Sequence, residues 1–180
     1  MTAATFPRER HAGILLPLFS AASSDGWGIG EIPDLVTLAA WQQRAGLDWL
    51  LMLPVSELAP SGHHSPYATL SAMAIDPIYL RVADVPEFAA AGGLEALPAE
   101  TRDRLEAVRR APRVDYDAIR ELKLSALRHA FARFEAERGR KHAARKRAFA
   151  AFASREAGWL DDYALYRALR DHFDAQPWWD

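Results

Sequence analysis

Two short apolar runs, residues 13–19 and 47–55, restrict the possible folds of this chain most strongly. Neither run alternates polar with apolar residues, which is typical of strands that are buried on both faces of a parallel sheet. Between the runs, apolar side chains recur at helical spacing over residues 35–41, after a helix-capping Asp34 and before Gly46, which suits a left-handed helix end. A strand, a helix and a strand with short joints predict a right-handed βαβ unit in which the two strands are parallel.

The second half of the chain has a different pattern. From about Pro98 onward, apolar residues fall three or four positions apart, first over residues 119–134 and again over residues 160–173. This spacing indicates helices whose aliphatic and aromatic stripes serve packing. We therefore divide the chain into residues 1–97, which hold the first strands and loops of an α/β unit, and residues 98–180, which form a helical subdomain.

Composition excludes several classes of protein. The 180 residues carry a net charge of −2 and no cysteine, so we expect no disulfides, no thiolate metal site and no general attraction to nucleic acid. The basic run 138–147 follows two glutamates on a helical pattern without interleaved aromatic residues, which indicates a solvated helix face. The sequence has neither an apolar stretch of about 18 residues nor the pattern of a secretory signal, so we expect a cytoplasmic protein without a membrane partner.

The loop between the first strand and the helix, residues 20–31, is rich in glycine and serine. Its glycines follow the pattern G-x-G-x-G, whereas a dinucleotide-binding loop has G-x-G-x-x-G, and Pro33 removes an amide where a pyrophosphate would need one. We therefore expect no nucleotide cofactor and assign the glycines to a tight turn. Asp25 and Trp27 are expected at the face formed by the carboxyl ends of the strands, where substrates of open α/β sheets bind.

A polar loop, residues 61–80, follows the second apolar run and is the main candidate for a binding site. It contains several hydroxyl groups, the adjacent His63 and His64, and Tyr67 directly after a proline. Adjacent residues of an extended loop point to different sides, and no third ligand stands at a suitable spacing, so we expect no metal site. From the loop alone, Tyr67 is equally well interpreted as a core residue and as a binding residue, while Ser65 fits a structural turn better than a ligand contact.

An ordered set of short motifs resembles one enzyme family. The motifs are Arg10–Ser20, Gly28–Glu31, Leu53–Pro54, Ser65–Tyr67, Ser71–Ala72, Asp76–Pro77, Val114–Tyr116, Lys123 and Trp159–Ala164. In this order and at these intervals, they are similar to the amino-terminal segment of the 4-α-glucanotransferases called amylomaltases or disproportionating enzymes. The resemblance covers essentially the whole chain, and its strength lies in the ordered set rather than in any single motif.

This resemblance implies a (β/α)8 TIM barrel with helical insertions that cleaves an α-1,4-glucosidic bond and transfers the glucan to another sugar's 4-hydroxyl, without a cofactor. The family uses a carboxylate nucleophile and a carboxylic acid/base with retention of configuration, and these acids sit on later barrel strands. A barrel of this type needs about 250 residues. The chain of 180 residues therefore predicts an incomplete barrel, with the first βαβ unit followed by a truncated, mostly helical insertion.

We accordingly expect no catalytic residue in this chain and no transferase activity from the 180 residues alone. We assign the role of nucleophile to none of the local acids. Asp161 and Asp162 are adjacent on a helix and point about 100° apart, and Glu31 and Asp115 stand where helices begin. These acids are expected to be helix caps or surface charges.

For binding, the resemblance places Tyr67 in the active-site cleft beside the sugar that is cleaved. Ser65, His64, Asp25 and Trp27 are further candidates for contacts with the substrate, an α-1,4-glucan such as a maltooligosaccharide. The alternative is a noncatalytic module that binds a glucan or a protein partner. Because an incomplete barrel leaves one sheet edge open, we also expect the isolated chain to self-associate.

Overall fold

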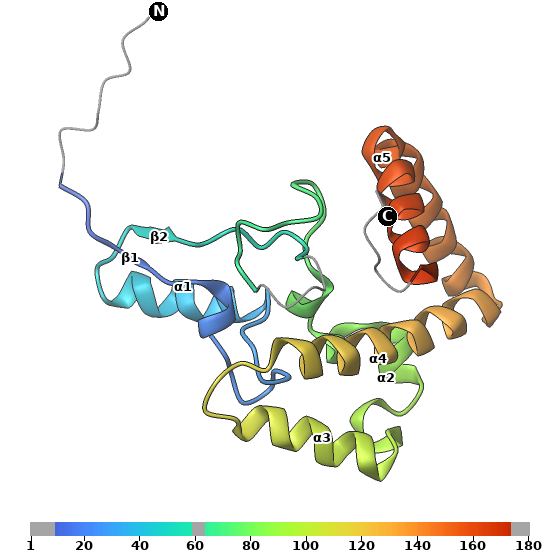
Figure 1. Ribbon diagram of the computed structural model, residues 1–180, viewed down its shortest axis with the longest axis horizontal. Helices are drawn as coiled ribbons and strands as arrows, with labels where there is room; N and C mark the ends of the chain where they lie inside the picture. Colours follow the sequence, from blue (N-terminus) through green and yellow to red (C-terminus); the bar gives the residue numbers. More distant parts are fainter. Residues whose placement is uncertain (1–9, 59–63, 174–180) are drawn as a thin grey trace, which may run out of the picture.

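The computed structural model describes residues 10–58 and 64–173, so Ser61, Gly62 and His63 of the predicted binding loop lie outside the described residues. The elements in chain order, with η denoting a short 3-10 helix, are β1 (Gly13–Leu15), η1 (Leu18–Ser20), α1 (Asp34–Arg44), β2 (Trp49–Leu51), η2 (Pro77–Tyr79), η3 (Val82–Asp84), α2 (Pro86–Ala90), η4 (Gly93–Ala96), α3 (Ala99–Arg110), α4 (Tyr116–Ala136) and α5 (Arg140–His172). Figure 1 shows the two strands and α1 on one side of the molecule and α5 on the other, with α3 and α4 running between them.

The two strands form a small parallel sheet. Gly13 of β1 pairs with Trp49 of β2, and Leu15 pairs with Leu51. The helix α1 connects the strands, and Gln42 near its end donates a 2.7 Å hydrogen bond from its side-chain amide to the carbonyl of Trp49. The predicted βαβ unit with parallel strands is therefore confirmed, within a structure that is mostly helical.

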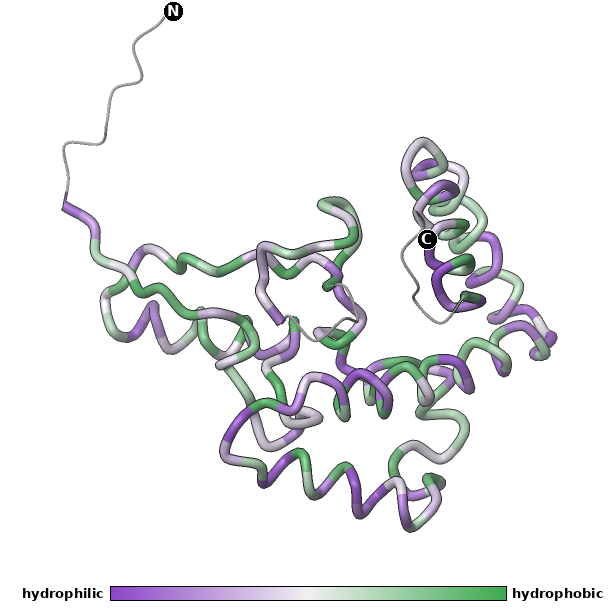
Figure 2. The backbone as a smooth tube through the Cα atoms, viewed as in Figure 1, coloured by the Kyte–Doolittle hydropathy of each residue, from purple (hydrophilic) through white to green (hydrophobic). Residues whose placement is uncertain are grey.

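Both strands are shorter and more exposed than the apolar runs predict. β2 ends at Leu51, and the side chains of Leu15 and Leu51 are 58% and 60% exposed. Figure 2 shows apolar residues along both strands, at a distance from the long helices. The prediction that these strands are buried on both faces is wrong for the described residues, because these residues provide no second layer to cover the sheet.

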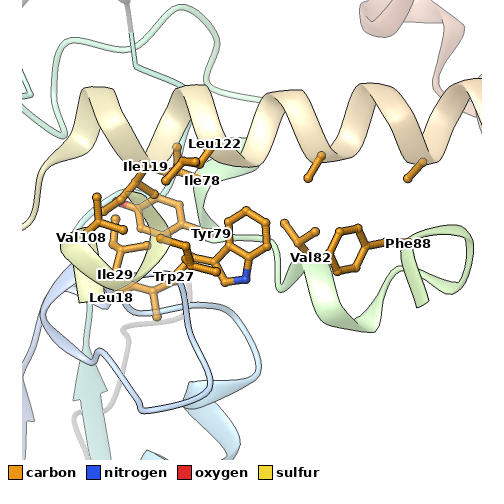
Figure 3. Close-up of a cluster of buried hydrophobic side chains, with 13 residues drawn as sticks. Leu18, Trp27, Ile29, Ile78, Tyr79, Val82, Phe88, Val108, Ile119 and Leu122 are labelled. Carbon is orange, nitrogen blue, oxygen red and sulfur yellow. The ribbon is translucent and has the colours of Figure 1, made fainter. Parts of the chain in front are cut away.

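The hydrophobic core lies away from the sheet, between the loop after β1, the segment around η2 and α2, and the helices α3 and α4 (Figure 3). Its buried members are Leu18, Trp27, Ile29, Ile78, Tyr79, Val82, Phe88, Leu105, Val108, Ile119, Leu122, Ala126 and Ala130. These residues come from both sides of position 97. The glycine-rich loop and the helices therefore share one core.

Two glycines of the loop over residues 20–31 make this packing possible. Gly28 has a φ of +81°, and a side chain there would place its Cβ 2.6 Å from the carbonyl oxygen of Val108 in α3. At Gly30, an added Cβ would lie 1.8 Å from the carbonyl oxygen of Leu18. The assignment of these glycines to a tight backbone path is confirmed, since any side chain would collide with neighbouring backbone.

The helical part is built around α4 and α5. Asp115 caps α4, because its carboxylate accepts a 3.0 Å hydrogen bond from the N–H of Ala118. Beyond α4, Gly139 has a φ of +117°, which allows the chain to turn into α5, and Phe134 packs near Phe149 of α5. The aromatic stripe at this joint thus serves packing. In the described part of the chain, no helix is long and apolar enough to cross a membrane.

Candidate functional site

Beyond β2 the chain continues in an extended path and then returns on itself. We call residues 56–58 and 64–76 the Tyr67 loop. Its two arms are joined by isolated antiparallel bridges, Ser56 with Ile75 and Leu58 with Thr69. The loop is therefore a closed unit that projects from the carboxyl end of β2, as the sequence predicts for the candidate binding loop.

Tyr67 is 73% exposed on this loop. The turn before it is built by Ser65, whose carbonyl accepts a 2.9 Å hydrogen bond from the N–H of Ala68 and whose hydroxyl accepts one of 3.4 Å from the N–H of Tyr67. The sequence leaves open whether Tyr67 is a core residue or a binding residue. Its exposure excludes the first interpretation in this structure. An exposed ring with apolar faces and a hydroxyl at its edge can stack on a sugar and donate or accept a hydrogen bond.

His64 connects the Tyr67 loop to the first turn of α4. Its ring stacks on the ring of Tyr116, with 4.6 Å between centroids and 16° between planes, and its Nε2 lies 3.7 Å from Oδ2 of Asp117. Tyr116 in turn makes an edge contact with Phe19, and burial raises the pKa of its hydroxyl. In this arrangement His64 holds the loop against the helix.

The structure separates Asp25 and Trp27 from the Tyr67 loop. Trp27 is only 1% exposed and packs edge-on against Phe88, so its indole is not at the strand-end surface where the sequence led us to expect it. The glycine-rich loop folds inward here and uses the ring as a core residue. Asp25 is exposed and accepts a 3.3 Å hydrogen bond from the hydroxyl of the adjacent Ser24.

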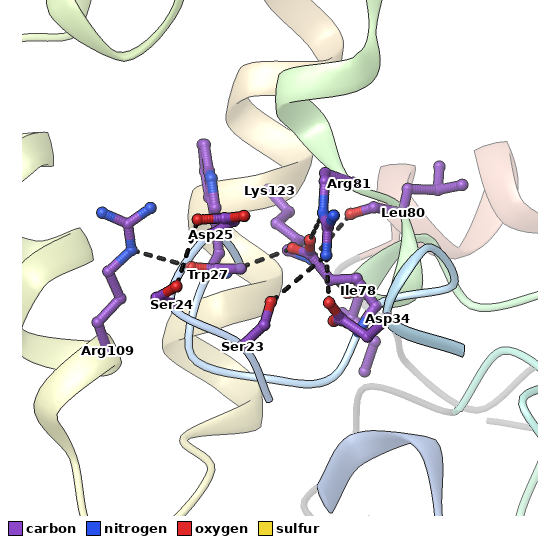
Figure 4. Close-up of polar contacts among 12 residues, drawn as sticks. Ser23, Ser24, Asp25, Trp27, Asp34, Ile78, Leu80, Arg81, Arg109 and Lys123 are labelled. Carbon is purple, nitrogen blue, oxygen red and sulfur yellow. Dashed lines mark hydrogen bonds and ion pairs between the residues drawn. The ribbon is translucent and has the colours of Figure 1, made fainter. Parts of the chain in front are cut away.

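A buried charge network ties the glycine-rich loop to α4 (Figure 4). Glu31 and Lys123 are completely buried, with 2.6 Å between Nζ of Lys123 and Oε1 of Glu31. The same ammonium group donates to the carbonyls of Ile78 and Leu80 at 2.6 and 2.8 Å. Burial lowers the pKa of Lys123, although the carboxylate of Glu31 opposes this effect. The prediction that Glu31 is a cap or surface charge is therefore wrong.

Arg81 and Asp34 extend this network to the start of α1. Arg81 donates from Nε to Oε2 of Glu31 at 2.8 Å and from its terminal nitrogen to Asp34. Burial would raise the pKa of Asp34, but hydrogen bonds from the backbone of Glu31, from Ser23 and from Arg81 lower it. Asp34 is the first residue of α1 and its side chain does not cap the helix, so the predicted capping role is wrong.

The network braces the fold rather than forming a reaction centre. Glu31 and Lys123 have no exposed surface, so a substrate cannot reach either group. Local sequence patterns missed this pair because the two residues are 92 positions apart. Only the family resemblance, whose motifs include Glu31 and Lys123, marks them out in the sequence.

The remaining acids match their predicted roles. Asp115 caps α4, and Asp161 is exposed on α5. In residues 10–58 and 64–173, no three or more His, Asp or Glu side chains come together as a metal site. Of the predicted substrate-binding residues, Tyr67 is the one whose aromatic ring is exposed to solvent.

These features define the class of protein: an α/β chain that begins with a βαβ unit, carries a polar loop at the carboxyl end of its second strand and continues into a helical layer. Residues 16–180 match a family model described as 4-alpha-glucanotransferase. The chain therefore belongs to the 4-α-glucanotransferase family, as its ordered motifs predict.

Curated relatives agree with this assignment. The chain is 32% identical over 167 residues to the 4-alpha-glucanotransferase of Chlamydia trachomatis, covering 92% of this chain and 29% of that protein. It is 30% identical over 171 residues to 4-alpha-glucanotransferase DPE2 of Oryza sativa subsp. japonica, covering 92% of this chain and 17% of the rice protein. It is 30% identical over 177 residues to the 4-alpha-glucanotransferase of Mycobacterium tuberculosis, covering 92% and 23%. The chain thus spans less than a third of the length of these relatives.

Proposed function

We propose that these residues belong to a cytoplasmic 4-α-glucanotransferase and supply one wall of its glucan-binding cleft. The family match over residues 16–180 and the names of the curated relatives support the reaction class. In such a reaction, a carboxylate attacks the sugar's anomeric carbon while the acid/base protonates the departing glycosidic oxygen, so the α-1,4 bond breaks and a covalent glycosyl-enzyme forms. The acid/base then takes the proton of another sugar's 4-hydroxyl, whose oxygen displaces the enzyme carboxylate with retention of configuration.

The observation that carries this proposal is the exposure of Tyr67 on a self-closed loop. The turn over residues 65–68 fixes the backbone that bears the ring, and the contact between His64 and Tyr116 holds the loop on α4. Because the backbone that carries the ring is already fixed, little further backbone conformational entropy is lost when a glucose unit stacks on the ring. The proposed ligand is an α-1,4-glucan, and the proposed role of Tyr67 is to bind one glucose unit through its face and hydroxyl.

The unit β1–α1–β2 is, in this proposal, the first part of a (β/α)8 barrel. Two observations support it: the strands are parallel, and their apolar side chains lie exposed where further strands and helices would cover them. The reacting carboxylates would come from later strands of the complete barrel. Residues of this chain would then bind and orient the glucan, while the covalent chemistry takes place at the neighbouring carboxylates.

Substitution of Tyr67 tests the proposed site. Tyr67→Ala should weaken binding of maltoheptaose by at least about tenfold, because it removes the whole stacking surface. Tyr67→Phe should keep most of the affinity because it retains the ring. Binding is measured by titrating maltoheptaose into isotopically labelled protein and following amide chemical shifts.

Met73→Ala is the matched control, since Met73 is also exposed on the Tyr67 loop but offers no ring. We expect this variant to bind maltoheptaose as the unaltered protein does. Equal affinity of the Tyr67→Ala variant and the unaltered protein would rule out the proposed role of Tyr67.

A further inference from the structure

Two arginines from different helices fasten the Tyr67 loop to the helical part of the chain. At one end of the loop, the buried carboxylate of Asp76 accepts hydrogen bonds from both terminal nitrogens of Arg120 in α4, at 3.0 and 2.6 Å. The same carboxylate accepts the N–H groups of Leu58 and Ile78, each at 3.1 Å. This end is firmly fixed, because both carboxylate oxygens are paired with an arginine and with backbone amides.

The other end is held much less completely. The side chain of Glu57 is only 3% exposed, and its Oε1 lies 3.1 Å from Nε of Arg167 in α5. The second oxygen, Oε2, is buried and has no hydrogen-bond partner among the described residues. Burial raises the pKa of Glu57 although the Arg167 guanidinium acts against it. Among the described residues, the carboxylate of Glu57 therefore has a single ion-pair partner, Arg167.

The backbone of Glu57 is also the point where the two arms of the loop meet. Its N–H donates to the carbonyl of Ala74 at 2.9 Å, and its carbonyl accepts from the N–H of Leu70 at 2.8 Å. Tyr67 lies three residues before Leu70 in the chain. Any movement of Glu57 therefore shifts the attachments of the segment that carries Tyr67.

Charged side chains link this point to the packing of α5. Arg167 also lies 3.6 Å from Asp171, and Asp171 lies 3.3 Å from Arg128 of α4. The chain of charges runs from α4 through the last turns of α5 to Glu57. Figure 1 shows α5 standing beside the rest of the molecule, so these side chains form a bridge between an outlying helix and the loop.

We propose that Arg167 is a positioning residue for glucan binding: through Glu57, the helix α5 sets the position of the Tyr67 loop. This inference rests on the proposed function of Tyr67. When Arg167 is lost, the buried carboxylate of Glu57 loses the only cation that pairs with it directly among the described residues, and it keeps only the weaker field of Arg120, which is already paired with Asp76. This loss favours movement of the carboxylate toward water or its protonation. The attachments at Asp76 and His64 stay in place, so the shift is confined to the Glu57 side of the loop, where Leu70 is bonded, and it changes the placement of Tyr67 between His64 and Leu70.

Amide hydrogen exchange in the full chain tests the local step. In Arg167→Gln, exchange at Leu70 should rise by about tenfold or more, because its hydrogen bond to Glu57 opens more often. Exchange at Leu58 and Ile78, which bond to Asp76, should stay unchanged. Arg155→Gln is the control, since Arg155 lies on the same helix in an exposed pair with Glu156. Unchanged exchange at Leu70 in Arg167→Gln would overturn the proposal.

Maltoheptaose binding tests the functional step. Arg167→Gln should raise the dissociation constant by about fivefold or more, since part of the population no longer presents Tyr67. Arg167→Lys should recover part of this loss because it keeps the charge. In a Glu57→Gln background, Arg167→Gln should have little further effect, because the buried charge is already gone.

The outcomes separate this inference from the proposed function. If exchange at Leu70 rises but the affinity for maltoheptaose is unchanged, Arg167 does not position the glucan site and the inference is wrong. If Tyr67→Ala also leaves the affinity unchanged, the proposed function of Tyr67 fails as well. If Arg167→Gln does not fold, Arg167→Lys is measured in the same way. Exchange at Leu70 and the dissociation constant should then still lie above those of the unaltered protein, because a lysine keeps the charge but not the Nε contact with Glu57. Normal exchange and normal affinity in Arg167→Lys would overturn the proposal.

Discussion

Glu31 and Lys123 form a buried ion pair whose remaining hydrogen-bonding groups are also paired. Both side chains are completely buried, yet Lys123 has a carboxylate and two backbone carbonyls as acceptors, and Glu31 also receives Arg81. A buried pair of this kind adds little net stability compared with well-packed apolar residues, but removal of one partner leaves an uncompensated charge. The pair therefore fixes three parts of the chain relative to one another: the glycine-rich loop, helix α4, and the segment that includes η2 and Leu80.

Lys123→Met should destabilise the protein by about 3–5 kcal/mol, because the buried carboxylate of Glu31 loses its main counterion. The double variant Glu31→Gln/Lys123→Met should lose less than the sum of the single variants, since it removes both charges. Urea unfolding measures these differences. Arg104→Gln is a matched control: Arg104 and Glu121 are also 2.6 Å apart but exposed, and we expect no measurable change. A Lys123→Met variant as stable as that control would contradict the structural role of the pair.

At the scale of elements, the glycine-rich loop decides how the first strand joins the helices. Between β1 and α1 it folds inward, places Trp27 in the core and brings its backbone against α3. Arg109 of α3 reinforces this contact by donating a 2.9 Å hydrogen bond from Nε to the carbonyl of Gly26. The glycine-rich loop therefore contributes to the core, whereas the Tyr67 loop exposes Tyr67 to solvent.

Gly30→Ala should lower the free energy of unfolding by about 3 kcal/mol or more, because the added Cβ meets backbone that cannot move aside as a side chain could. Gly158→Ala makes the same chemical change inside α5, where an added Cβ meets nothing within 4 Å. It should stabilise the protein by about 0.5–1 kcal/mol, as alanine favours the helix. Thermal unfolding of the two variants beside the unaltered protein gives the comparison. If Gly30→Ala unfolded at the same temperature as the unaltered protein, the backbone around Gly30 would have room for a side chain.

The described residues combine a well-packed core with a two-stranded sheet that they leave exposed on one face. The core lies between the loops and α3 and α4, whereas Leu15, Trp49 and Leu51 of the sheet remain exposed. Parallel strands are normally covered on both faces, and open strand edges pair readily with other chains. We therefore expect the exposed sheet to associate with other polypeptide, either with further strands of a complete barrel or with a second copy of the chain.

The 180-residue chain should therefore self-associate in sedimentation velocity experiments at micromolar concentration, and Leu51→Glu should reduce the associated fraction by placing a charge on the exposed sheet. Leu165→Glu is the control, because Leu165 is also 60% exposed but lies on α5. It should leave association unchanged. A monomeric unaltered chain over the whole concentration range would count against the uncovered sheet as an association surface.

Much of the arrangement near the amino terminus could be predicted from local patterns. Apolar runs and helical spacing predicted β1, α1 and β2, because strand and helix periods are properties of neighbouring residues. Asp115 was correctly predicted as a cap and Ser65 as a turn residue for the same reason. Asp34 was not, since its carboxylate is engaged by Arg81, which lies far away in the chain.

Local periods and an ordered set of motifs were enough to predict the first strand–helix–strand unit, the parallel pairing of its strands, the helical second half and the family. Which side chains are buried and which face solvent became known only from the three-dimensional arrangement of the chain. It sent Trp27 into the core, left Tyr67 exposed, and paired Glu31 with Lys123 and Glu57 with Arg167. Burial and ion pairing between distant residues depend on the path of the whole chain in space. The spacing of neighbouring residues in the sequence carries no information about that path.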